Sequence, residues 1–390
     1  MLKVGIVGCG KIADAHATQI LRIGDCEIVG VCDREPLMAQ QLCDRLPVKR
    51  YFSDLIELLT EARPDVIHIT TPPESHFDIA RVCLEHGCHV YVEKPFTVDA
   101  RQAQQLVDLA EKKGLKLTAG HNLQFSHAAR RLRALVTDGY LGGQPVHMES
   151  NYCYDLGNAA YARALLGDRQ HWVRRLPGKL LHNIISHGIA RIAEFLPGDD
   201  VQVIAHGFTS PLLRGIGETE IVDELRVIIS DSQQTTAYFT FSSQMRPSLH
   251  DFRIYGPKNG LILDQDHEIL LRLRGTKFKS FADFFIPPVL FARQHLSNLV
   301  RNAKLFLARD FHMDAGMKVL IESFYRSIRE DAPPPIPYRE ILLTARIMDM
   351  IFDQLRDQVP DQPAASPSHA DLAFQRQPVA FETAVPAMKP

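Results

Sequence analysis

The sequence lacks several features that would assign it to a specialised class of protein. It contains seven cysteines but no C-x-x-C pair, so neither a zinc site nor a disulfide framework is indicated, and we expect no bound metal. No run of 18 or more apolar residues occurs, which argues against a membrane-spanning helix. No secretory signal is evident at the start of the chain. We therefore expect a soluble protein of the cytoplasm.

An excess of charge of one sign is also missing. Lys and Arg total 44 and Asp and Glu total 46, which leaves a formal net charge of −2. This balance gives no electrostatic reason to expect nucleic acid as a partner. Hydrophobic residues make up 45% and charged residues 23%, which excludes wholesale disorder, collagen and a coiled-coil rod. The 390 residues are enough for about two domains of ordinary size.

Up to about residue 122, short β-branched runs alternate with longer helical patterns. We expect strands at 4–7, 27–32, 65–70, 89–92 and 116–119, and helices at 12–23, 35–46, 53–61, 75–86 and 99–113. Strands separated by helices of this length indicate βαβ units and a doubly wound parallel sheet. Residues 1–122 are therefore predicted to form a Rossmann-type domain.

From about residue 144 the strands follow one another with only short breaks. They are expected at 144–154, 201–209, 224–230, 235–243, 251–255, 261–263 and 268–273, with one helix at 180–196 and a last one at 340–355. Turn-connected strands indicate an open, mostly antiparallel sheet. We assign residues 123–357 to this second α/β domain and 358–390 to a disordered tail rich in Pro, Ala, Ser and Gln.

Residues 284–309 are both apolar and basic. Phe284, Phe285 and Phe291 stand among cations that include Arg301 and Lys304. Two interpretations are open: an amphipathic helix on a membrane surface, or a helix packed against its own domain or a neighbouring subunit.

A glycine-rich turn separates the first strand from the first helix. Gly8, Gly10 and Ala13 form the pattern G-x-G-x-x-A. Gly8 allows the tight turn, Gly10 lets the backbone approach a pyrophosphate, and Ala13 keeps the helix near the sheet. The helix amides beginning at Lys11 and Ile12 would face the anion. The turn therefore predicts a dinucleotide site.

An acid follows the second strand about 20 residues further on, as such a site requires. Asp33 would accept hydrogen bonds from the adenosine ribose and repel a 2′-phosphate, which favours NAD. Arg34 comes next and can pair with that phosphate, so NADP stays possible.

The loops after the fourth and fifth strands should reach the same cofactor, because ligands bind at the carboxyl ends of parallel strands. Thr71, Pro72 and His76 belong to the first of these loops, and Glu93 and Lys94 to the second. His76 is equally consistent with a packing role. A lysine in a site of low polarity can act as an acid or base, although a surface salt bridge between Lys94 and Glu93 is the alternative.

Together these segments resemble the Gfo/Idh/MocA family of oxidoreductases. The resemblance lies in 4–13 with His16, in Asp33, in 71–73 with His76, in Glu93-Lys94-Pro95 and in the hairpin 255–260. It implies NAD(P)-linked oxidation of a hydroxyl of a sugar, nucleotide sugar or cyclitol, with a lysine at position 94 in the proton transfer. It also implies a homo-oligomer formed through the second sheet.

The family's other catalytic element is usually an Asp followed four residues later by a His. Here Asn183 precedes His187 at that spacing, which places both on one face of a helix. Because an amide cannot exchange a proton, we expect His187 and Lys94 to act as acid and base and Asn183 to hold a hydroxyl.

Further residues are predicted to line the cleft. Asn122 should reach the cofactor, and His121, Trp172 and Arg174 the substrate. Two other functions remain open. One is a sensor that binds a dinucleotide without chemistry, which Asn183 favours. The other is a redox-neutral glycosidase or epimerase that uses NAD transiently.

Overall fold

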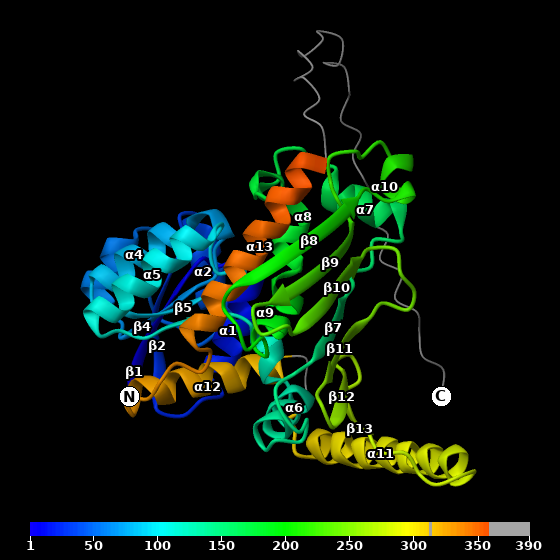
Figure 1. The fold of residues 1–390 in the computed structure, drawn as a ribbon. Helices are drawn as coiled ribbons and strands as arrows, with labels where there is room; N and C mark the ends of the chain where they lie inside the picture. Colours follow the sequence, from blue (N-terminus) through cyan, green and yellow to red (C-terminus); the bar gives the residue numbers. More distant parts are fainter. Residues whose placement is uncertain (312–313, 359–390) are drawn as a thin grey trace, which may run out of the picture.

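The computed structural model describes residues 1–311 and 314–358 and arranges them around two β-sheets (Figure 1). The tail expected at 358–390 lies, from residue 359 onward, outside the described residues.

The first sheet has six parallel strands in the order β3-β2-β1-β4-β5-β6. The strands are β1 (Leu2–Val7), β2 (Cys26–Cys32), β3 (Tyr51–Phe52), β4 (Val66–Ile69), β5 (His89–Val92) and β6 (Leu117–Ala119). This order confirms the predicted doubly wound Rossmann sheet, and it reverses between β1 and β4, where such sheets bind ligands. Of these strands only β3 was not predicted, because a strand of two residues is too short to show an alternation of apolar and polar residues.

Helices connect these strands close to the predicted positions. They are α1 (Lys11–Ile20), α2 (Pro36–Arg45), α3 (Leu55–Glu57), the π-turn η1 (Leu58–Ala62), the 3-10 turn η2 (Pro73–Ser75), α4 (His76–Glu85) and α5 (Ala100–Lys113). Helix α5 begins and ends as its sequence indicates: the Asp99 side chain accepts a hydrogen bond from the Gln102 amide, and Gly114 ends the helix with φ +66°.

The second sheet has seven strands in the order β13-β12-β11-β7-β10-β9-β8. They are β7 (His147–Tyr152), β8 (Val201–Phe208), β9 (Glu224–Asp231), β10 (Thr236–Ser242), β11 (His250–Tyr255), β12 (Asn259–Asp264) and β13 (Ile269–Arg274). All neighbours are antiparallel except β7 and β10, so the predicted mostly antiparallel sheet is confirmed.

The other helices flank this sheet or join it to the first domain. They are η3 (Asn122–Phe125), α6 (His127–Thr137), α7 (Ala159–Leu166), η4 (Trp172–Arg175), α8 (Lys179–Ile184), α9 (Ser186–Ala193), α10 (Pro211–Gly215), α11 (Ala282–Leu307), α12 (Ala315–Arg329) and α13 (Tyr338–Gln358).

The single helix predicted at 180–196 is wrong. The chain forms α8 and α9 instead, with Ile185 between them. The Ile185 carbonyl accepts from the Gly188 amide at 3.0 Å, a bond of the tighter i+3 type, as well as from Ile189 at 3.1 Å. The apolar stripe of the sequence continues through this break, so it gave no sign of it.

Two C-terminal helices bind the two sheets together. Helix α12 packs on the first sheet, where Leu320, Phe324 and Tyr325 are fully buried in that domain's core. Helix α13 lies between α5 of the first domain and α9 and β8 of the second (Figure 1). The opposite face of the second sheet stays open, with Ile204 exposed by 66% and Tyr238 by 51%.

Candidate active site

The glycine-rich turn joins β1 to α1 at the point where the strand order reverses. Gly8 has φ +95°, and a Cβ there would lie 2.7 Å from the Thr71 backbone nitrogen. A Cβ on Gly10 would meet nothing within 4 Å. Gly8 therefore lets the turn pass close to the end of β4, whereas Gly10 leaves open space beside it.

Helix α1 begins directly at this turn. Gly10 is its N-cap residue, and no side chain caps the helix. Lys11 and Ile12 are exposed, whereas Ala13 is buried against the sheet. Because the first amides of a helix lack intrahelical partners, they suit an anion such as a pyrophosphate. The open space and the uncapped amides fit a dinucleotide.

Asp33 stands beside the turn, as the sequence predicted. Its Oδ2 accepts a hydrogen bond from the Cys9 amide at 2.7 Å, and its Oδ1 accepts one from the Glu35 amide at 2.9 Å. Each oxygen keeps a further lone pair, so the carboxylate can still accept from ribose hydroxyls. Arg34 is exposed next to it.

The loop after β4 is fixed by His76. Its Nε2 lies 2.8 Å from the Thr71 carbonyl oxygen and its Nδ1 lies 3.0 Å from that of Pro95. The buried ring thus ties the end of β4 to the end of β5. A contact between His76 and a cofactor stays a prediction. The contacts that His76 makes with the two loops are those of a positioning residue. Thr71 is partly buried and Pro72 exposed in this loop.

Lys94 follows β5 and reaches the second domain. Its Nζ donates a hydrogen bond to the backbone carbonyl of Asn183 at 3.1 Å. That carbonyl lies at the end of α8, where the helix break leaves carbonyls without intrahelical partners and the helix dipole is negative. Burial lowers the pKa of Lys94, and the charge of Glu93 opposes that shift. Lys94 is therefore held where the two domains meet.

Glu93 belongs to a buried polar network beneath Lys94. Its Oε1 lies 2.9 Å from His16 Nε2, His16 Nδ1 lies 2.8 Å from His68 Nδ1, and His68 Nε2 lies 2.8 Å from the hydroxyl of Tyr325 on α12. Burial by itself would raise the pKa of Glu93, but His16 and Lys94 together outweigh burial through their hydrogen bonds and charges, and the pKa is lowered. A Cβ on Gly120 would lie 2.7 Å from Glu93 Oε1, so the carboxylate needs a glycine beside it.

His187 and His121 face each other across the domain boundary. Their ring centroids are 6.0 Å apart. Burial, followed by the charges of Lys94 and His121, lowers the pKa of His187 well below its usual value. Burial also lowers the pKa of His121 to about 4. Within the described part of the chain, His187 Nδ1 and His121 Nε2 are buried without a hydrogen-bond partner. Two neutral imidazoles thus have nitrogens to offer to a ligand.

The helix break changes how Asn183 and His187 are related. The prediction placed them on one face of one helix, but Asn183 belongs to α8 and His187 to α9. Asn183 meets Lys94 through its backbone carbonyl. A bond from its side-chain amide to a substrate hydroxyl stays a prediction.

A cavity of about 490 Å³ is connected to His187 through Tyr152, a residue that lines it. Asn122, Tyr152 and His250 line it, and the Tyr152 ring lies 5.8 Å from that of His187. The size is that of a small-molecule site. The sequence predicted Asn122 as a cleft residue but gave no sign of Tyr152 and His250, because both lie at strand ends that only the sheet register brings together.

The side chain of Arg174 makes other contacts than the predicted one with a substrate. Its Nη2 donates to a Glu218 carboxylate oxygen at 2.6 Å, and the Leu166 carbonyl is its other partner. These contacts anchor the segment before α8, and they do not support the predicted contact with substrate. The Trp172 ring lies 5.3 Å from that of His171 in the same segment.

A link across the domains was missed entirely. Arg175 donates two hydrogen bonds to the carboxylate of Glu74, from Nε at 2.7 Å and from Nη2 at 2.9 Å. Glu74 lies in η2, directly after Pro73. The pair joins the loop after β4 to the segment that precedes α8.

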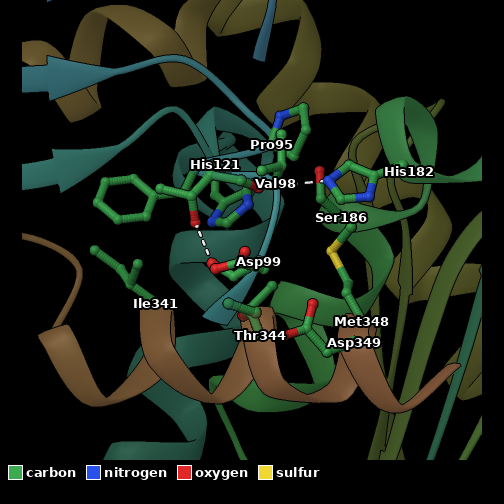
Figure 2. Close-up of a pocket in the computed structure, with 13 residues that line it drawn as sticks. Pro95, Val98, Asp99, His121, His182, Ser186, Ile341, Thr344, Met348 and Asp349 are labelled. Atoms are coloured by element: carbon green, nitrogen blue, oxygen red, sulfur yellow. Dashed lines mark hydrogen bonds between the residues drawn. The ribbon is translucent and has the colours of Figure 1, made fainter. Parts of the chain in front are cut away.

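A second, much smaller cavity lies beside Pro95 (Figure 2). His121, His182 and Ser186 line it opposite the α13 residues Thr344 and Met348. Its volume of about 20 Å³ accommodates one water molecule and excludes a sugar. Burial lowers the pKa of His182 to about 4, and its ring stacks on Phe352 at 5.0 Å. This histidine is therefore part of the packing between the domains.

Fold and site together define a two-domain protein with a Rossmann dinucleotide-binding domain. The sequence model "Oxidoreductase family, NAD-binding Rossmann fold" of the Gfo/Idh/MocA group matches residues 2–121. Residues 2–121 are thus similar to the NAD-binding domain of the Gfo/Idh/MocA oxidoreductases.

Two curated relatives match mainly this domain. The chain is 34% identical over 142 residues to D-glucoside 3-dehydrogenase of Escherichia coli (strain K12), covering 36% of this chain and 40% of the relative. It is 32% identical over 132 residues to UDP-N-acetylglucosamine 3-dehydrogenase of Acidithiobacillus ferrooxidans, covering 34% of this chain and 41% of the relative. The alignments thus span about two fifths of the length of these relatives.

Solved structures match over both domains. The WlbA dehydrogenase of Bordetella pertussis, solved with NADH and UDP-GlcNAcA, gives a TM-score of 0.72 at 18% identity and covers 92% of this chain and 96% of that one. UDP-N-acetylglucosamine 3-dehydrogenase GnnA of Acidithiobacillus ferrooxidans gives a TM-score of 0.68 at 20% identity, covering 90% and 96%. At these identities the likeness establishes the two-domain fold.

Proposed function

We propose that the protein is an NAD-dependent dehydrogenase that oxidises a secondary hydroxyl of a sugar, nucleotide sugar or cyclitol. One observation carries this proposal: the charge of Lys94 acts on the buried, unpartnered ring of His187, and Tyr152, whose ring lies 5.8 Å from that of His187, lines a cavity of about 490 Å³. Three relatives support a substrate of the sugar or cyclitol class, since their names are D-glucoside 3-dehydrogenase, UDP-N-acetylglucosamine 3-dehydrogenase and myo-inositol 2-dehydrogenase.

The chain's own part in the reaction is to bind the dinucleotide and to take up a proton. The turn from Gly8 to Ala13 and the carboxylate of Asp33 would hold the dinucleotide, and NAD, when bound, supplies the acceptor for the hydride. The alcohol carbon would lose that hydride with its two electrons, while the hydroxyl proton passes to His187 Nδ1 or to Lys94 Nζ in its neutral amine form. A His187 ring whose pKa is lowered is neutral near pH 7 and can accept a proton.

The remaining predicted residues surround this centre. Asn122 and Tyr152 line the cavity and would contact the ring-shaped substrate or the cofactor. We also propose a cytoplasmic homo-oligomer, because the open face of the second sheet offers a surface for another subunit. Within residues 1–311 and 314–358, no helix is long and apolar enough to cross a membrane.

Replacing Lys94 with Ala tests the proposal. Loss of a positioned acid or base typically costs about 10²- to 10⁴-fold in rate, so turnover should fall by at least about 100-fold. NAD affinity should change little, because the turn that binds the dinucleotide is untouched. NADH formation at 340 nm with methyl glucoside, UDP-N-acetylglucosamine and myo-inositol gives turnover, and calorimetry gives NAD affinity.

Lys112→Ala is the matched control, since it removes an exposed lysine on α5. Normal turnover in the Lys94→Ala variant would refute the role of Lys94. Asn183, where the family commonly has Asp, favours a second candidate, a dinucleotide-binding sensor without chemistry. That candidate predicts NAD binding with no conversion of any substrate, whereas a redox-neutral enzyme would convert substrate without accumulating NADH.

A further inference from the structure

Helix α11 is attached to the second domain by one side only. Asn298, its one buried residue, donates from Nδ2 to the Leu270 carbonyl at 3.1 Å. Gln294 accepts from the Arg272 amide at 2.8 Å and donates to the Arg272 carbonyl at 3.2 Å. Two amide side chains therefore bond the helix to the outer strand β13. The helix runs beneath β12 and β13 and continues past them, away from the body (Figure 1).

The side of α11 opposite these amides carries an exposed apolar stripe. Phe285, Val289, Leu296, Leu299 and Leu307 are exposed by 71%, 59%, 61%, 64% and 79%. At 100° per residue they lie within about 40° of one direction, and the bonding amides lie on the far side of the helix. Side chains of this size rarely form a continuous exposed row on a soluble surface.

Cations accompany this stripe almost without acids. Between residues 272 and 309 the chain carries eight Lys or Arg and one acid, Asp283. The basic residues are Arg272, Arg274, Lys277, Lys279, Arg293, Arg301, Lys304 and Arg309. The rest of the chain has 36 basic and 45 acidic residues, so it carries a net negative charge, in contrast to the net positive charge of this segment. Arg272, Arg274, Lys277 and Arg293 line a cavity of about 820 Å³ between α11 and β13.

The positive charge of this segment distinguishes between two possible partners of the stripe, a second copy of the chain and a lipid surface. In a symmetric pair of chains the same surface faces itself, so two segments with seven excess positive charges would meet and repel. An anionic lipid surface offers opposite charge over its whole area. A helix with an apolar face, flanking cations and few acids is also the type that lies in the headgroup boundary of a bilayer.

We propose that α11 docks the protein peripherally on an anionic lipid bilayer. The stripe from Phe285 to Leu307 enters the boundary between headgroups and acyl chains, and the cations contact lipid phosphates. The helix lies in the plane of the surface and does not span the bilayer. This inference is independent of the dehydrogenase proposal.

Flotation of the full chain with vesicles tests it. We expect retention on vesicles of phosphatidylcholine mixed with phosphatidylglycerol, little retention on phosphatidylcholine alone, and weakening by salt. Arg293→Gln with Lys304→Gln, the two cations that flank the stripe, should weaken binding roughly 30-fold, given the usual contribution of each cation near an anionic surface. Lys49→Gln with Lys112→Gln removes the same charge elsewhere and should bind as the wild type does.

A second pair of substitutions tests the apolar contact. Leu296→Ser with Leu299→Ser should weaken binding by about tenfold or more, while Leu21→Ser with Ile56→Ser, which changes two exposed apolar residues elsewhere, should have little effect. The proposal is overturned if anionic vesicles do not retain the protein, or if the α11 variants bind as the wild type does. It is equally overturned if Leu296→Ser with Leu299→Ser converts an oligomer into smaller species in light scattering without any vesicle binding, because a second copy then covers the stripe.

Discussion

At the scale of single residues, the environment of Lys94 decides what its amine can do. Burial lowers its pKa and the adjacent Glu93 carboxylate raises it again. The carboxylate is itself kept ionised by His16, at 2.9 Å, and by the Lys94 amide, which donates to Oε2 at 3.0 Å. Lys94 is thus tuned by one charge that the sequence places directly before it.

We expect Glu93→Gln to move the pH profile of the reaction. Without the carboxylate the Lys94 ammonium loses a stabilising charge, so the pKa of Lys94 falls and the acidic limb of kcat/KM moves to lower pH. The glutamine oxygen can still accept from His16, which preserves the packing. The measurement is kcat/KM against pH in both proteins. A limb that moves to higher pH contradicts the argument, and an unmoved limb assigns proton uptake to His187.

At the scale of elements, the two glycines of the glycine-rich turn differ in conformation and in the space around them. Gly8 has φ +95° and no room for a Cβ, whereas Gly10 has φ −75° and free space. The first glycine is needed to fold the turn, and we expect the second to admit the dinucleotide. Substitutions can therefore separate stability from binding.

Gly10→Ala should leave the free energy of unfolding unchanged and weaken NAD binding on the order of tenfold, because the methyl group enters the space that a pyrophosphate needs. Gly8→Ala should lower the free energy of unfolding by about 2 kcal/mol or more, since alanine at positive φ is strained and its Cβ meets Thr71. Urea unfolding and NAD calorimetry measure the two effects. Gly24→Ala, with nothing within 4 Å of its Cβ, is the control. Normal NAD affinity in Gly10→Ala would show that the dinucleotide lies elsewhere.

The helix pair α8 and α9 is the element that the site depends on most. A continuous helix would pair the Asn183 carbonyl with the amide of His187. The break at Ile185 leaves that carbonyl to the Lys94 ammonium. The irregular backbone at Ile185 therefore frees the carbonyl through which Lys94 connects the two domains at the site.

At the scale of the whole molecule, buried histidines hold the two domains and their helices together. Burial lowers the pKa of His68, which bonds to Tyr325 on α12, and that of His182, which packs against Phe352 on α13. The unfolded chain then binds more protons than the folded one below about pH 6.5. The stability that these rings contribute is fully present above that pH and is lost as the pH falls.

We therefore expect the free energy of unfolding to decrease from pH 7 to pH 5, and His182→Gln to reduce that dependence. His182, with a folded pKa of about 4, contributes at most about 1.4 kcal/mol per pH unit between pH 6.5 and 4. Urea unfolding across this range measures the slope. His86→Gln, at an exposed position, should leave the slope unchanged. A slope that His182→Gln leaves intact would assign the acid sensitivity to other groups.

Much of this organisation was predictable from local pattern. The apolar β-branched runs predicted five of the six strands of the first sheet. Gly8, Gly10 and Asp33 predict a dinucleotide site, because a turn, a close approach and an acid at a strand end are local requirements, and that site stays a prediction. The helix at 284–309 was also predicted, but its two interpretations stayed open. The pattern could not say which face packs on β13.

By itself, the sequence determined the Rossmann domain, the mostly antiparallel second sheet and the position of Lys94 at the end of a strand, since these follow from hydrophobic period and turn chemistry within short windows. Only the tertiary structure decided that His68 meets Tyr325, 257 positions away, that Arg174 pairs with Glu218, and that Lys94 reaches Asn183. Such contacts depend on how whole elements pack. No window of sequence contains both partners, so no local pattern can specify them.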